Sequence, residues 1–363
     1  MVALRRRGES VAVFNVNIIQ GNAMRQYLPA FTCAFLLLIS SAAIAGKKAV
    51  VVPVVPVQGA KDTLVAAFND KSVVEGTFVD TGNKKHGFFG TVAGSYTTFN
   101  YNASGNTVAI GIDTAGDMTG GYYGSSLNFC DATPWERTAN GQIAAIKNGT
   151  KAMTGLAWGM NTGGDFVGYT CDQTGVVSGY KGKAGKFTGK VTISGFQLAT
   201  APSAIDDSGM IVGWSVDTGG VAKGFILKGS TTSFVTYPKA KSTQLLGLDN
   251  AGLASGVWTD TKDVQHAFIY DTKKSKFTSI EPKTAKTSVA GSINSDGVVA
   301  LYSDVGSFLY CTNKKKCPKG GALVQTGPSI HVPAGQFLHY DNGAISQRTG
   351  MPHISMKVPY FAN

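Results

Sequence analysis

The chain has 363 residues, 46 of them glycine, and a net charge of +11, but only 15% of its residues are charged. This balance excludes a protein built from long charged helices and favours many short strands joined by tight turns. The length exceeds that of a typical single domain, yet closed repeat folds use such a length as one unit.

A predicted export signal begins at Met24. Arg25 supplies a short positive region, residues 30–40 form an apolar run, and Ala43-Ile44-Ala45 is a small-residue cleavage site. The apolar run is shorter than the roughly 20 residues that span a bilayer, which disfavours the alternative of a membrane anchor. We expect cleavage between Ala45 and Gly46, and therefore a secreted or periplasmic protein.

Cleavage divides the chain into two parts. Residues 1–45 are interpreted as an upstream extension plus the signal, with translation starting at Met24, and residues 46–363 as one domain. The mature part keeps 29 basic and 21 acidic side chains, a net charge of +8. Such a charge favours acidic partners, although the lysines are scattered over the chain. No aromatic-plus-basic motif indicates nucleic-acid binding, and we expect a monomer without a membrane span.

An internal repeat follows. Each copy has an apolar residue, then Asn or Asp, then turn-forming residues that often include Gly. The copies begin 44, 48, 45, 43 and 45 residues apart, at Phe68, Ile112, Met160, Ile205, Leu248 and Ile293. Eight residues after each start stands a glycine, except in the sixth copy, which has Leu301; these glycines are Gly76, Gly120, Gly168, Gly213 and Gly256.

Each copy is predicted to form a meander of about four short strands. The Asn and Asp residues accept backbone hydrogen bonds in turns, and Gly takes the positive φ that closes hairpins. Four-stranded modules at this period are typical of propeller blades, whose ring closure protects the sheet edges. We therefore predict an all-β propeller of about six four-stranded blades, with five to seven possible. Either the apolar run Val50–Gln58 or a strand near residues 336–343 could close the ring.

The repeat resembles a known family through one tripeptide. His266-Ala267-Phe268 has His86-Gly87-Phe88 and Lys223-Gly224-Phe225 at the same phase. These segments resemble the HAF repeat of bacterial extracellular proteins, and the similarity covers about residues 64–310. The resemblance implies a β-propeller-like fold and an exported protein, and it implies no activity.

Four cysteines remain after cleavage, which in an oxidising compartment indicates two disulfides. Cys311 and Cys317 are close enough to pin a hairpin end, and Cys130 and Cys171 would then bridge neighbouring repeats, although four cysteines allow three pairings. Zinc is disfavoured because no CxxC or clustered His accompanies them.

Several residues are candidates for a functional site. The turn acids Asp113, Asp206 and Asp249 could line one end of the ring and bind calcium, but Asn serves at the same phase in other copies, which favours a role in turn geometry. His86 and His266 are interpreted as residues of a strand face. Tyr122, Tyr123 and Trp135 border the insertion at residues 121–150 of the second copy and are the candidates for a ligand-facing loop.

No familiar nucleophile, metal-hydrolase or phosphate-binding motif occurs, so we expect no catalytic, metal or cofactor-binding residues. The leading hypothesis is an exported, non-enzymatic binding or scaffold module for a carbohydrate or protein at the cell envelope or outside the cell. The alternative is a propeller enzyme that acts on polysaccharide through paired carboxylates, which would require acidic side chains converging in one central cleft.

Overall fold

The computed structural model describes residues 50–124, 129–172, 176–196, 198–217, 219–282 and 284–318. The predicted signal and the C-terminal segment around residues 336–343 lie outside the described residues. All of these described residues belong to a single compact unit of the chain.

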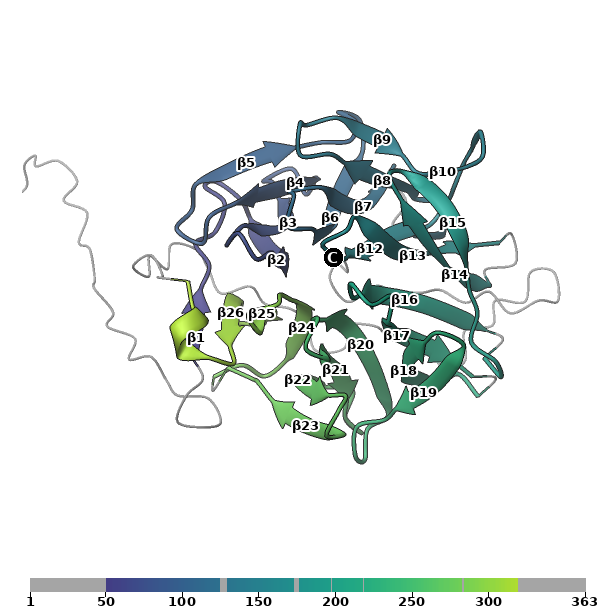
Figure 1. Cartoon of the computed structure of the whole chain (residues 1–363). Helices are drawn as coiled ribbons and strands as arrows, with labels where there is room; N and C mark the ends of the chain where they lie inside the picture. Colours follow the sequence, from purple (N-terminus) through teal and green to yellow (C-terminus); the bar gives the residue numbers. More distant parts are fainter. Residues whose placement is uncertain are drawn as a thin grey trace, which may run out of the picture. The chain divides into compact units, whose positions relative to one another are not determined.

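The described residues form six successive antiparallel meanders, which we call modules 1 to 6 (Figure 1). Module 1 contains β2 (Asp62–Phe68), β3 (Val74–Val79), β4 (Lys85–Gly90) and β5 (Tyr96–Phe99). Module 2 contains β6 (Asn106–Ile112), β7 (Met118–Tyr123), β8 (Thr133–Arg137) and β9 (Ile143–Ala145), with the short 3-10 helix η1 (Phe129–Asp131). A small hairpin, β10 (Lys147–Asn148) and β11 (Lys151–Ala152), leads to the next module.

Modules 3 to 5 repeat the same order of strands. Module 3 contains β12 (Leu156–Met160), β13 (Asp165–Cys171), β14 (Val177–Lys183) and β15 (Lys186–Val191). Module 4 contains β16 (Ala199–Ile205), β17 (Ile211–Val216), β18 (Ala222–Lys228) and β19 (Thr231–Val235). Module 5 contains β20 (Ser242–Leu248), β21 (Leu253–Thr259), β22 (Gln265–Asp271) and β23 (Lys276–Ser279).

Module 6 combines the two ends of the described chain. It contains β24 (Ser288–Ile293), β25 (Val298–Ser303) and β26 (Gly306–Cys311), followed by η2 (Lys314–Lys316). Its fourth strand is β1 (Val50–Pro53), which pairs antiparallel with β26. The apolar N-terminal run therefore supplies the closing strand, one of the two possibilities that the sequence left open.

The all-β propeller class is confirmed, but the predicted count of separate blades is corrected. Four modules are separate four-stranded sheets, whereas modules 3 and 4 share one ten-stranded sheet with the β10–β11 hairpin. A single parallel pair, Val177 with Ala199, joins the two modules, because the Val177 N–H donates to the Leu198 carbonyl as the chain enters module 4.

The innermost strands of the modules surround one centre. Each contacts the innermost strand of the next module, and β24 contacts β2, so the ring is closed (Figure 1). At the closing junction the Phe68 N–H donates to Ser292 Oγ (3.1 Å), and the Ser307 hydroxyl donates to the Thr63 carbonyl (2.9 Å). Module 6, which contains strands from both ends of the described chain, thus joins module 1 and leaves no open junction in the ring.

The repeat glycines have a specific packing role. Each inner strand has an irregular register or bulge, and in modules 1 to 5 it directs a carbonyl at the glycine that faces it on the second strand. A Cβ at Gly256 would lie 2.1 Å from the Gln244 carbonyl oxygen, and at Gly76 it would lie 1.9 Å from the Leu64 oxygen. No side chain fits at such distances, which explains the glycine phase that the sequence displays.

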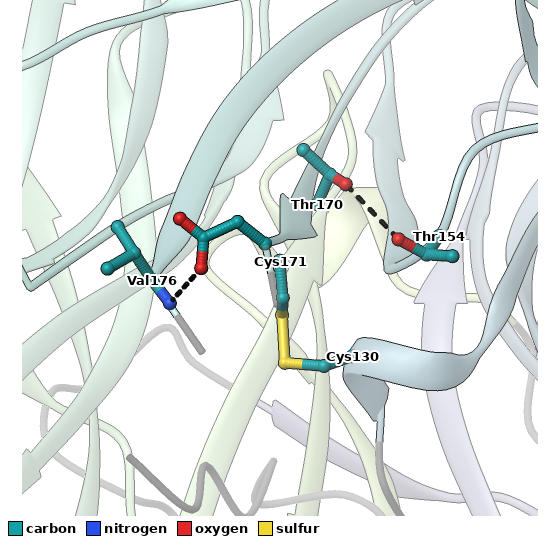
Figure 2. The surroundings of a disulfide bond; sticks show 6 residues. Cys130, Thr154, Thr170, Cys171 and Val176 are labelled. Carbon is teal, nitrogen blue, oxygen red and sulfur yellow. Dashed lines mark hydrogen bonds between the residues drawn. A yellow bond between two sulfur atoms is a disulfide. The ribbon is translucent and has the colours of Figure 1, made fainter. Parts of the chain in front are cut away.

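Two disulfides confirm the predicted cysteine pairing. Cys130 and Cys171 link η1 of module 2 to the end of β13 in module 3, with 5.1 Å between their Cα atoms (Figure 2). Cys311 and Cys317 enclose η2 after β26. The first disulfide therefore joins two modules and the second fixes the end of the ring, as expected for a protein of an oxidising compartment.

A search of the described segments for membrane-crossing helices finds none of sufficient length and apolarity.

Candidate functional site

The ring holds a central cavity at the end where each innermost strand turns into the second strand. It is open to solvent and has a volume of about 80 Å³. Every module contributes the same five consecutive positions, as in Ala66–Asp70 of module 1 and Ser203–Asp207 of module 4. The internal repeat thus becomes a site only when all six modules meet.

The wall and floor of this cavity are apolar. The last residue before each turn forms the wall, and these residues are Phe68, Ile112, Met160, Ile205, Leu248 and Ile293. Deeper in the cavity lie Ile110, Trp158 and Leu246, which also belong to a buried cluster with members from all six modules, including Tyr169 and Tyr302. This cluster fills the centre of the ring beneath the cavity.

The turns above the wall are shaped by their first residue, which is always Asn or Asp. The Asn161 side-chain oxygen accepts from the N–H groups of Gly163 (3.0 Å) and Asp165 (2.8 Å). The Asp206 carboxylate does the same for Ser208 and Met210. All six residues are buried, and they are Asn69, Asp113, Asn161, Asp206, Asp249 and Asn294. The interpretation of the turn acids as turn formers is therefore confirmed.

The three asparagines also connect the modules. Asn69 Nδ2 donates to the Asp113 carbonyl (2.9 Å), Asn161 Nδ2 to the Asp206 carbonyl (3.2 Å) and Asn294 Nδ2 to the Asn69 carbonyl (3.4 Å). A carboxylate cannot donate in this way. Three of the six junctions therefore have an acid where the others have a bridging amide.

The second residue of each turn forms the rim of the cavity. These residues are Asp70, Thr114, Thr162, Asp207, Asn250 and Ser295. Neighbouring rim residues hydrogen-bond to one another: Thr162 Oγ1 donates to Asp207 Oδ2 (2.7 Å), and Asn250 Nδ2 donates to the same oxygen (2.7 Å). The Ser295 N–H likewise donates to Asp70 Oδ1 (2.9 Å) across the closing junction.

This rim was not among the predicted site residues. The signal that could have found it was the repeat itself, because the rim is the residue that follows the Asn or Asp of each copy. Hydroxyl, amide and carboxylate groups around an apolar floor suit a ligand with many hydroxyl groups and an apolar face.

Five carboxylates line the cavity, namely Asp70, Asp113, Asp206, Asp207 and Asp249. Burial raises the pKa of Asp113 and of Asp249 above the ordinary aspartate value, although backbone N–H groups of their own turns counteract part of that effect. Acidic residues therefore surround one central cleft, although the Oδ1 atoms of Asp113, Asp206 and Asp249 accept backbone N–H groups of their own turns. In the described part of the chain, no group of three or more His, Cys, Asp or Glu could hold a metal ion.

The predicted ligand-facing aromatic residues lie elsewhere. Trp135 is fully buried between Ala109 and Phe99, and Tyr123 is 2% exposed within the central cluster. The prediction is wrong for these two residues, because they lie on β7 and β8, whose side chains pack between modules. Tyr122 is half-buried, contacts Tyr101 and hydrogen-bonds Ser104. None of the three lines the cavity.

The histidines of the tripeptide are fixed on the strand face by a hairpin acid. His266 Nδ1 contacts Glu281 Oε1 (2.8 Å), its Nε2 lies 3.4 Å from Asp260 Oδ2, and its ring stacks on Trp258. In module 4, Lys223 pairs with Asp217 at 3.2 Å in the same place. In Asp217 and Asp260, one carboxylate oxygen accepts backbone N–H groups of the turn and the other contacts Lys223 or His266, so this position is structural.

A buried glutamate, Glu136, lies between modules 2 and 3. Glu136 is 8% exposed, the Gly185 N–H donates to it, and burial together with Asp117 and Asp113 raises its pKa to about 7. A carboxyl whose pKa is raised on folding favours the folded state in its protonated form, so its contribution to stability is lost as pH rises from about 4.5 to 7.

We predict that Glu136→Gln makes the protein more stable than the wild type at pH 8 and equally stable near pH 4.5. The expected gain at pH 8 is roughly 2–3 kcal/mol, since the amide has no charge to desolvate. Denaturant unfolding at pH 4.5, 6, 7 and 8 measures it. A difference that does not change with pH would contradict the assignment.

No protein-family model matches the chain, and no curated protein is similar to it in sequence. Among solved structures, the chain resembles TolB from Acinetobacter baumannii, with 12% identity and a TM-score of 0.48 over 65% of this chain and 64% of that chain. The chain thus spans somewhat less than two thirds of that TolB.

Two other solved structures that resemble the chain are a lectin and a peptidase. The Aleuria aurantia lectin shares 8% identity, with a TM-score of 0.44 over 69% of this chain and 90% of that one. The Pyrococcus horikoshii acylaminoacyl peptidase shares 13% identity, with a TM-score of 0.41 over 69% of this chain and 45% of that one. Such distant likenesses indicate no function. The fold is established by the sheet topology, and a functional inference must rest on the cavity.

Proposed function

We propose that this protein is an exported binding propeller of the HAF-repeat type, which binds a hydroxyl-rich ligand such as a carbohydrate in its central cavity and does not transform it. The observation that carries the proposal is the rim: six equivalent turn residues place hydroxyl, amide and carboxylate groups around one apolar cavity. The two disulfides support a location outside the cytoplasm.

The rim groups match the chemistry of sugar hydroxyls, which both donate and accept hydrogen bonds. Asp70 and Asp207 can accept from such hydroxyls, Asn250 can donate and accept, and Thr114 and Ser295 can do both. Apolar C–H surface of a sugar ring would lie against the wall below. A protein ligand is the other partner class expected from the sequence, and a loop inserted into the cavity would use the same groups.

The proposal is tested by blocking the mouth of the cavity with a large side chain. Thr114 lines the rim, and within the described part of the chain its side chain makes no hydrogen bond across the ring, so Thr114→Trp should fill the mouth without breaking a junction. We expect the wild type to bind one glycan class on an array at both low and high salt, and Thr114→Trp to weaken that binding by about tenfold or more.

Ala115→Trp is the matched control. Ala115 is the next residue of the same turn, is exposed and does not line the cavity, so its replacement should leave binding unchanged. Equal loss in both variants, or binding that high salt abolishes, would contradict a central carbohydrate site.

Hydrolysis of a polysaccharide is the second candidate, and the five aspartates among the residues that line the cavity favour it. A buried acid with a raised pKa, such as Asp249, has the property of a general acid. Asp249→Asn should preserve the turn, because Asn occupies this position in modules 1, 3 and 6. If the wild type releases reducing ends from a polysaccharide and Asp249→Asn does not, the protein is an enzyme and the binding proposal is wrong.

A further inference from the structure

Four lysines meet on two strands of module 3 and on the β10–β11 hairpin that precedes it. Lys181 and Lys183 lie on β14, Lys186 on β15 and Lys147 on β10, and all four are exposed. The β14–β15 hairpin brings three of them to one face, and the pairing of β10 with β15 adds Lys147.

Three of them form a row across adjacent strands. Lys183 pairs directly with Lys186 across the β14–β15 hairpin, and Lys186 pairs directly with Lys147 of β10. Directly paired residues have their side chains on the same face of a sheet, with Cβ atoms about 5 Å apart. Lys181 lies two residues from Lys183, and its stem covers Gly189 on that face.

The hairpin turn enforces this arrangement. Its two central residues, Ala184 and Gly185, both have positive φ, at 49° and 69°. This is the tight two-residue turn that places the flanking residues, Lys183 and Lys186, directly opposite each other. Like charges directly opposite destabilise a sheet, so the row is maintained against a local electrostatic cost.

The positive charge of the row is only partly neutralised. Asp165 on β13 pairs with Lys183, and their charged groups are 3.2 Å apart. Among the residues that the structure describes, no acidic side chain forms an ion pair with Lys147, Lys181 or Lys186. Glu136 lies beneath the turn, buried, where it accepts the Gly185 N–H.

We propose that this lysine row, Lys147, Lys183 and Lys186 with Lys181 beside it, is a second binding surface that holds a linear anionic polysaccharide. Lysines repeated at the strand spacing of about 4.8 Å form a straight line of charge, which complements a polymer with regularly repeated sulfate or carboxylate groups. The surface is separate from the central cavity, since none of these lysines lines it.

The experiment measures binding of a fluorescent heparin oligosaccharide to the full chain by anisotropy, at about 50 and 150 mM salt. We expect the triple variant Lys147→Gln, Lys183→Gln, Lys186→Gln to raise the Kd by about tenfold or more at the higher salt. The matched control, Lys228→Gln, Lys262→Gln, Lys276→Gln, removes the same charge from exposed sites in modules 4 and 5 and should change the Kd by less than about twofold.

Unchanged circular dichroism and melting temperature of both triple variants show that the fold is retained. Equal weakening by the two triples would mean general charge attraction and would overturn the proposal, as would absence of heparin binding. Binding to phosphatidylglycerol vesicles but not to heparin would also overturn it, in favour of a membrane surface. Thr114→Trp should leave heparin binding unchanged, so this surface can fail or succeed independently of the cavity.

Discussion

Gly256→Ala will lower the free energy of unfolding by about 3 kcal/mol, because its Cβ would lie 2.1 Å from the Gln244 carbonyl oxygen and 3.0 Å from the Phe268 ring. The contact is with backbone, so no rotamer change relieves it. The inner strand β20 must move away, and its hydrogen bonds with β21 must lengthen. Urea unfolding followed by tryptophan fluorescence measures the loss.

Gly124→Ala is the control for this prediction. A Cβ at Gly124 meets no atom within 4 Å, and its backbone is not in the left-handed region, so alanine should be neutral or slightly stabilising. Equal stability of the two variants would contradict the packing role of the repeat glycine.

Removal of β1 is expected to have the other large effect. A chain that begins at Val54 loses the pairing of residues 50–53 with β26, and it loses Val52, which is buried against Leu309 and Cys311. Burial of one valine and the hydrogen bonds of a short strand together stabilise by about 4 kcal/mol. A chain that begins at Ala49 keeps the strand and is the control.

The two chains are compared by thermal unfolding and by amide exchange. Loss of the closing strand should lower the melting temperature and should speed exchange in β26, while exchange in module 3, across the ring, changes least. If both chains unfold at the same temperature, β1 does not close the ring.

Much of the architecture was encoded locally. The glycine phase, the Asn or Asp of each turn and the alternating strand residues predicted the meanders, because turn geometry and strand pairing act within about ten residues. The pairing of Cys311 with Cys317 followed for the same reason. The Asp–His and Asp–Lys contacts of the hairpins also lie within one copy. The sequence did not reveal that one carboxylate both accepts the backbone N–H groups of its turn and contacts the His or Lys side chain.

The contacts between copies of the repeat could not be predicted from the sequence. Trp135 looks like a loop residue beside an insertion, yet it is fully buried, because the face it occupies on β8 packs between modules. The union of modules 3 and 4 in one sheet depends on a single parallel pair that no local pattern specifies.

The class of fold, the turn residues and the pairing of Cys311 with Cys317 follow from the sequence, since each depends on short-range geometry. The tertiary structure alone decided the sites. The cavity rim takes one residue from each of six copies about 45 positions apart, and the lysine row takes residues from three strands, including Lys147 and Lys186. Ring closure and strand register bring such residues together, and both are set by the burial of apolar faces between modules, a property of the whole ring.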